Sequence, residues 1–157
     1  IASVTELAAI YRSQNSYPVL LNSTISGNPE AMSESELASK ARPIVSRWTK
    51  KQLSDRLAET INGLGKDLAS TDLAQIAHAA AHGRVATLFV DNTSEVPGRI
   101  KSGTGKLTLA KRPNAQTYDV LDELVGLVLR SGGEVLPIAA TAIPGDSPAA
   151  AAFRFRS

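Results

Sequence analysis

The stretch AHGRVATLFVD, Ala81 to Asp91, decides the fold of this chain of 157 residues. Residues 84–90 form a nearly continuous apolar run rich in β-branched side chains, which is typical of a strand covered on both faces. Gly83 stands immediately before the run, and a residue that tolerates a left-handed backbone commonly ends a helix. The stretch therefore predicts a helix that ends at a glycine and leads directly into a buried strand.

A helix is expected on the amino-terminal side of this strand. Asp72 and Gln75 have the spacing of an N-cap and its partner in the first turn. The apolar residues that follow recur at helical spacing. This inner stripe consists of Leu73, Ile76, Ala77 and Ala80.

A second helix and two further strands are expected on the carboxyl-terminal side. Thr117 is predicted to cap a helix over residues 118–130, which the segment SGG then ends. A second buried strand is expected over 134–140, and a last one over about 150–155. The order strand, helix, strand favours parallel pairing of the first two strands. The expected fold class is a layered α/β domain.

The pattern of the first thirty-one residues predicts a small segment that does not fold by itself. A helix is expected over about 4–13, a short strand at YPVLL (17–21) and a turn at SGNPE (26–30). Because this segment is too small to bury a core, we interpret residues 1–31 as the tail of a preceding domain.

Residues 32–69 predict a helical connector. Ser33 and Glu36 form a capping-box pattern, and an apolar stripe follows. Pro43 is expected to kink or divide the helix unless it lies in the first turn. Trp48, the one tryptophan, is interpreted as a core anchor.

Composition limits the classes of protein and of partner. The net charge is +2, so no strong overall field points to nucleic acid or a membrane surface, and no DNA partner is expected. No apolar run of about 18 residues predicts a membrane span. The chain has no cysteine, which excludes disulfides and thiolate metal sites and fits a reducing cytoplasm.

Three segments in order carry a family resemblance: AHGRVATLFVD, YDVLDELVGLVLRSGGEVLPI and PGDSPAAAAFRFR. Together they resemble the third, C-terminal domain of the archaeo-eukaryotic peptide-chain release factors and of Pelota. More specifically, they resemble the bacterial relatives of those factors. The upstream SGNPEAMSESELASKA is similar to that group's passage from its middle domain into the third domain.

The resemblance implies a fold and a role. The fold is a layered α/β/α sandwich with a mixed sheet, related to the kink-turn-binding ribosomal proteins, over residues 70–157. The preceding middle domain of full-length relatives resembles ribonuclease H and carries a Gly-Gly-Gln loop for peptidyl-tRNA hydrolysis. That tripeptide is absent from this sequence. The third domain of the relatives docks a translational GTPase, so a ribosome-associated or translation-associated partner is implied.

The string SGTGKL (102–107) suggests a phosphate-binding loop, but the requirements are not met. Aligning its lysine on Lys106 places Ile100 at the first glycine and Leu107 at the magnesium-binding hydroxyl. The following KLTLA alternates like a strand and does not open a helix. We predict a hairpin or connector here and no nucleotide site.

A basic cluster surrounds this loop without an acidic residue between Pro97 and Pro113. Such side chains can contact RNA phosphates, or they can simply keep a loop soluble. The absence of nearby aromatic residues for base stacking favours the second interpretation. The candidate contacts for RNA or a partner are Arg99, Lys101, Lys106, Lys111 and Arg112.

No catalytic, cofactor or metal residue is predicted. His78 and His82 lie four residues apart, but they point away from the helix's apolar stripe and suggest no third ligand, so we interpret them as surface histidines. No nucleophile stands beside a base.

Three functional hypotheses follow. The first is a non-catalytic C-terminal interaction module of a release-factor-like protein, associated with ribosomes or translation. The second is a fragment of a peptidyl-tRNA or other hydrolase whose active site lies upstream. The third is a direct RNA-binding domain that uses residues 97–113.

Overall fold

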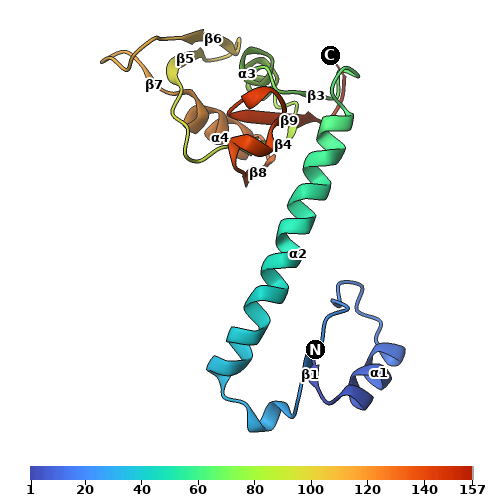
Figure 1. Cartoon of the computed structure of the whole chain (residues 1–157). Coiled ribbons are helices and arrows are strands. Elements are labelled where there is room, and N and C mark those ends of the chain that lie inside the picture. Colours follow the sequence, from blue (N-terminus) through green and yellow to red (C-terminus); the bar gives the residue numbers. More distant parts are fainter. Residues whose placement is uncertain (157) are drawn as a thin grey trace. The chain divides into compact units, whose positions relative to one another are not determined.

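The computed structural model describes residues 1–156, and Figure 1 traces their helices and strands. The chain divides into two units, one of residues 1–53 and one that begins at Ser54. The division falls inside the 29-residue helix α2, Glu34–Asn62. The expected boundaries after residues 31 and 69 stay predictions.

The first unit contains little regular structure besides its helices. Strands β1, Ala2–Ser3, and β2, Ile25–Ser26, pair in parallel. Helix α1, Thr5–Gln14, lies between them in sequence, close to its predicted position, and a single 3-10 turn covers Pro29–Ala31.

The prediction of a strand at YPVLL (17–21) is wrong. Pro18 and Val19 form a turn, and β2 begins only at Ile25. A proline suits a turn because its φ is fixed near the required value and it has no N–H to donate to a ladder.

Helix α2 begins with the predicted capping box. The Ser33 N–H donates to Oε2 of Glu36 at 2.9 Å, and the Glu36 N–H donates to Oγ of Ser33 at 3.3 Å. The bond from the Ser33 N–H, helped by one from the Ser33 hydroxyl to the same Oε2 at 3.0 Å, lowers the pKa of Glu36. Pro43 lies inside the helix and does not divide it. The core position expected for Trp48 is wrong, because 39% of this residue is exposed.

The second unit is built on a four-stranded mixed sheet. Its strands are β3, Ala69–Ser70, β4, Val85–Val90, β8, Glu134–Pro137, and β9, Ala149–Phe153, in the order β3-β9-β4-β8. β4 and β8 pair in parallel, as predicted, and β9 runs antiparallel to β3 and β4. β8 is shorter than expected and is an edge strand with half-buried side chains.

Both faces of β4 are covered. Leu88 and Phe89 point to opposite faces, and both are fully buried. The face of Leu88 is covered by helices α3, Leu73–Ala81, and α4, Val120–Arg130. At the end of α2, Leu57 is buried and the Arg56 guanidinium pairs with Glu134 of β8 at 2.5 Å.

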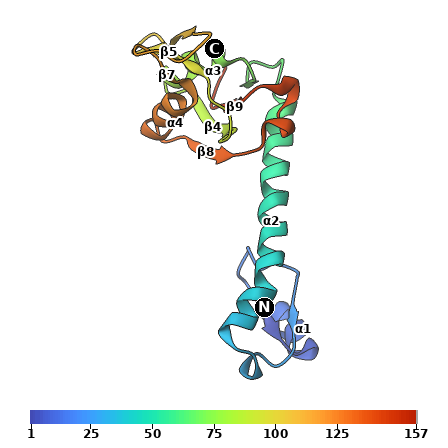
Figure 2. The same cartoon turned by 60° about the vertical axis from the view of Figure 1, so that its left-hand side comes forward.

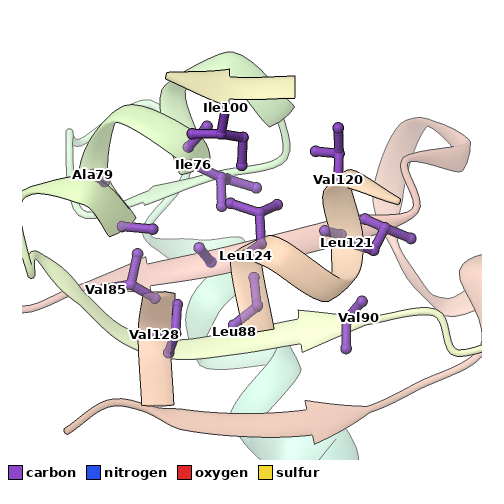
Figure 3. Close-up of a cluster of buried hydrophobic side chains, with 14 residues drawn as sticks. Ile76, Ala79, Val85, Leu88, Val90, Ile100, Val120, Leu121, Leu124 and Val128 are labelled. Atoms are coloured by element: carbon purple, nitrogen blue, oxygen red, sulfur yellow. The ribbon is translucent and has the colours of Figure 1, made fainter. Parts of the chain in front are cut away.

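A three-stranded antiparallel sheet adds a layer of which the sequence predicted only a hairpin or connector around residues 102–107. It consists of β5, Pro97–Lys101, β6, Lys106–Leu109, and β7, Tyr118–Asp119, in the order β6-β5-β7. Figure 2 shows this sheet beside α3 and α4. In Figure 3, Ile100 of β5 lies next to Ile76 of α3, on the side of the helices away from Leu88. Two 3-10 turns, Ala140–Ala142 and Pro144–Asp146, complete the unit.

The predicted cap of the second helix is wrong. α4 begins at Val120, and Oδ1 of Asp119 accepts the Leu121 N–H at 3.0 Å. The hydroxyl of Thr117 instead accepts the N–H of Asn114 at 2.9 Å, inside the preceding turn. Residues 118–119 are extended because they pair with β5, so the helix starts two residues later. Within residues 1–156, no helix has the length and apolar character needed to cross a bilayer.

Candidate functional site

The hairpin β5–β6 places three of the predicted cations on one face. Residues that pair across an antiparallel ladder point to the same side of the sheet. Lys101 pairs with Lys106, and Arg99, two residues before Lys101, points the same way. All three are exposed, whereas Ile100, between them, is buried against the helices. We call the exposed side with Arg99, Lys101 and Lys106 the basic face.

The other two cations lie beyond the far end of the hairpin. The Ala110 N–H donates to the carbonyl of Pro97 at 2.9 Å, so Lys111 and Arg112 follow the last bond of the ladder. Lys101 is four residues from Pro97, a distance of about 14 Å along a strand. Lys111 and Arg112 are exposed and are not part of the basic face.

Of the two glycines of SGTGKL, Gly105 allows close packing of the hairpin against α3. The turn at residues 102–105 joins two strands, as predicted for a hairpin, and the Gly105 N–H donates to the Lys101 carbonyl at 2.9 Å. A Cβ at Gly105 would lie 2.6 Å from the Ala77 carbonyl oxygen and from the Cα of His78. The hairpin therefore approaches α3 so closely that no side chain fits. Strand β6 stands where a phosphate-binding loop requires a helix.

Tyr118 fixes the other side of the hairpin. Its hydroxyl accepts the Ile100 N–H at 2.7 Å and donates to the Ile100 carbonyl at 3.1 Å. This hydroxyl takes the place of a ladder partner beyond the end of β7. The basic face is thus held by α3 on one side and by the start of α4 on the other.

Asp91, at the end of β4, is buried in a hydrogen-bonded turn, as expected of an aspartate after a strand. The hydroxyls of Ser94 and Thr93 donate to its carboxylate, and so does the Thr93 N–H at 3.2 Å. The bond from Ser94, helped by those from Thr93, lowers the pKa of Asp91. This turn fixes the start of the loop that leads to the hairpin.

We predict a pH-dependent effect of Asp91→Asn on stability. The folded state prefers the charged carboxylate, so its contribution is fully present above the unfolded-state pKa of about 3.9 and is lost as the pH falls through the lower folded-state pKa. Urea denaturation should show the variant less stable at pH 7, with the difference shrinking below about pH 4. A difference that stays constant from pH 7 to pH 3 would contradict this origin.

His78 and His82 are exposed, and their ring centroids are 4.4 Å apart. Among the described residues, no three histidine, cysteine or carboxylate side chains gather where they could hold a metal ion.

A cavity that the sequence analysis missed lies beside α3. It has a volume of about 440 Å³ and is lined by Gln75, Arg84 and Phe153 among others. Gln75 lies on α3, Phe153 on β9 and Arg84 in the short connection between α3 and β4. The one signal in the sequence was the alternation Phe153-Arg154-Phe155-Arg156, which we interpreted only as a family motif.

The fold of a mixed sheet with α3 and α4 on one face is that of release-factor C-terminal domains. The C-terminal domain of a peptide chain release factor from Methanosarcina mazei matches 81% of this chain and 98% of its own length, with 14% identity and a TM-score of 0.56. Archaeal Pelota, in a model of ribosome-bound Pelota and ABCE1, matches 96% of this chain with 18% identity and a TM-score of 0.55. Pelota from Archaeoglobus fulgidus matches 99% with 17% identity and a TM-score of 0.53.

The amino-acid sequence identifies the family through its match to a protein-family model. The model of the bacterial archaeo-eukaryotic release factor family 3 matches residues 1–84, and the chain belongs to this family. This confirms the resemblance on which the fold was predicted. The chain spans 40% and 48% of the lengths of the two Pelota chains. Comparison with curated proteins finds no match.

Proposed function

We propose that this chain is the non-catalytic C-terminal interaction module of a bacterial release-factor-like protein and associates with ribosomes in the cytoplasm. The observation that carries the proposal is family membership together with a fold that spans 98% of a release-factor C-terminal domain. The ribosome-bound state of the similar archaeal Pelota supports the choice of partner. A translational GTPase is the second partner class to test.

The basic face is the surface that we assign to this contact. Arg99, Lys101 and Lys106 are exposed on a hairpin that α3 and Tyr118 hold in place. Because the backbone of the hairpin is fixed before binding, little loop entropy is lost on association.

Co-sedimentation of the chain with bacterial ribosomes at low salt tests the proposal. The control variant R42A/R47A/K50A removes three exposed cations from α2 and leaves the basic face intact. We expect the wild-type chain and this control to sediment with ribosomes and R99A/K101A/K106A to remain in the supernatant. No sedimentation of the wild-type chain would contradict the proposal.

Direct RNA binding by the basic face is the second candidate function, because the hairpin aligns three cations on one side. Each phosphate contact contributes about 0.7–0.9 to the salt slope of the binding constant. We expect R99A/K101A/K106A to lower the slope for purified ribosomal RNA by about 2–3. Fluorescence anisotropy over a range of salt concentrations measures it. An unchanged slope would place the RNA contacts elsewhere.

We also propose that residues 1–31 belong to a larger middle domain of the ribonuclease H type. Its support is the exposure of apolar side chains on α1: Leu7, Ile10 and Tyr11 are each more than half exposed, and Ala8 is the buried residue of this helix. Side chains of this kind are normally covered in a folded protein. The hypothesis that the chain is a fragment of a hydrolase is compatible with this proposal, because the active site of such an enzyme would lie in the middle domain.

A further inference from the structure

The cavity at the carboxyl end of β9 is a half-open cleft with the volume of a ligand site, and Asp67, Gln75 and His78 in its lining are exposed. Its volume of about 440 Å³ lies within the range of about 300–1,000 Å³ that is usual for small-molecule sites. We call it the Arg84 cavity. Its lining residues are Asp67, Ala69, Ala74, Gln75, His78, Arg84 and Phe153.

Backbone hydrogen bonds fix the aromatic wall of this cavity. The Phe153 N–H donates to the carbonyl of Leu68 at 2.8 Å, and the Arg154 N–H donates to the carbonyl of Arg84 at 2.8 Å. The end of β9 is therefore held on both sides. The ring of Phe153 lies at the cavity in a position set by the sheet.

The planar guanidinium of Arg84 is held in a fixed position by two aromatic rings and a backbone carbonyl. Its carbon lies 5.3 Å from the ring centroid of Phe153 and 5.7 Å from that of Phe155, and Nη2 donates to the Phe155 carbonyl at 3.1 Å. Its Nε is buried without a partner among the described residues. A plane fixed in this way, together with an aromatic ring, is suited to stacking with another flat group.

The polar part of the lining offers a donor and an acceptor. The Ser70 hydroxyl accepts the Asp72 N–H at 3.0 Å and donates to Oε1 of Gln75 at 2.8 Å. This arrangement sets the orientation of the amide and leaves the Nε2 of Gln75 as a donor. Asp67 supplies a carboxylate acceptor, and its φ of 57° is a conformation that few residues other than glycine adopt.

A flat ligand with a hydrogen-bonding edge fits this lining better than a simple anion. The carboxylate of Asp67 would repel a free phosphate or sulfate, whereas it can accept from an exocyclic amino group of a base. Arg156, three residues after Phe153, is exposed and supplies a cation for a phosphate attached to such a ligand, whereas Nη2 of Arg154 already donates to the Ser131 carbonyl at 2.9 Å. We propose that the Arg84 cavity binds the base of a phosphorylated nucleoside. This site is separate from the basic face and does not depend on the proposed function.

Two probes distinguish the two sources of such a base. AMP tests a free nucleotide by calorimetry, and a fluorescein-labelled oligoadenylate of about ten nucleotides tests a single strand by anisotropy. We expect the chain to bind at least one of them with a dissociation constant below about 1 mM. Binding of AMP identifies a nucleotide site. Binding of the oligonucleotide alone identifies a single-strand site at the cavity only if R99A/K101A/K106A, which lacks the basic face, binds it as well. Binding of neither overturns the proposal.

Two conservative variants test the assigned contacts. Phe153→Leu keeps apolar bulk but removes the ring, and we expect at least a fivefold loss of affinity, because stacking on an aromatic side chain is the contact removed. Gln75→Glu keeps the acceptor for Ser70 but removes the Nε2 donor, and we expect a loss of about tenfold. Thermal unfolding followed by circular dichroism checks that both variants fold.

The variant R99A/K101A/K106A is the matched control, because it removes only the basic face. It should bind AMP like the wild-type chain, so a failed Arg84 cavity and a failed basic face give different results. Folded Phe153→Leu and Gln75→Glu variants that both bind like the wild-type chain would overturn the proposal.

Discussion

Leu124→Ala lowers the free energy of unfolding of the α/β unit by about 2–5 kcal/mol, whereas Leu129→Ala, in the same helix, lowers it by less than about 1 kcal/mol. Leu124 is fully buried in the cluster that joins α3, α4 and both sheets, and Leu129 is 56% exposed. Figure 3 shows Leu124 between Ile76 and Leu88. Truncation of the Leu124 side chain removes buried methyl groups and leaves a cavity between the two sheets. Movement of one sheet toward the cavity would not restore the contacts with the other.

Urea denaturation followed by circular dichroism measures both variants under the same conditions. The two substitutions remove the same atoms and lose the same helix-forming side chain, so their difference isolates burial. Equal losses at the two positions would contradict the placement of α4 between the sheets.

The helix-to-strand junctions of the α/β unit could be predicted because their signals are local. Asp72 with Gln75 identifies the start of α3, and the Gln75 N–H does donate to Oδ1 of Asp72, at 2.9 Å. Gly83 has a φ of +67°, as a helix-ending glycine requires. The apolar run after it forms β4 within one residue of the prediction.

Predictions failed where a tertiary contact outweighs the local pattern. Threonine and aspartate are both favoured N-cap residues, with Asp somewhat ahead of Thr, so residue type alone does not exclude Thr117. Pairing of residues 118–119 with β5 decides between them, and that pairing joins segments twenty residues apart. Trp48 is a similar case, because periodicity identifies an apolar stripe on a helix but not whether a partner covers it.

In the candidate sites, too, features with a local sequence signal could be predicted and tertiary contacts could not. The five cations near the hairpin could be recognised by composition, but the register of β5 and β6 selects the three that share a face. The one local signal of the Arg84 cavity was the alternation of Phe and Arg at residues 153–156, which does not by itself predict a cavity. Asp67, Gln75, Arg84 and Phe153 meet only because β9 returns to lie between β3 and β4.

The second large effect is expected at Gly105, where the hairpin meets α3. Gly105→Ala should lower the free energy of unfolding by about 3 kcal/mol or more, and Gly103→Ala by only about 1–2 kcal/mol. Both glycines have a positive φ, +63° and +81°, so both substitutions carry the cost of a left-handed backbone. They differ in the space around them. A Cβ at Gly103 meets nothing within 4 Å, whereas one at Gly105 would lie 2.6 Å from two backbone atoms of α3.

Backbone atoms of a helix cannot move aside as the end of a flexible side chain can, so Gly105→Ala must displace the hairpin from α3. That displacement reaches the basic face, since Lys106 is the next residue and Lys101 is its partner in the ladder. We therefore expect Gly105→Ala to weaken ribosome association under conditions in which the protein stays folded, while Gly103→Ala leaves association close to wild type. Equal loss of stability in the two variants would mean that the hairpin does not rest on the helix.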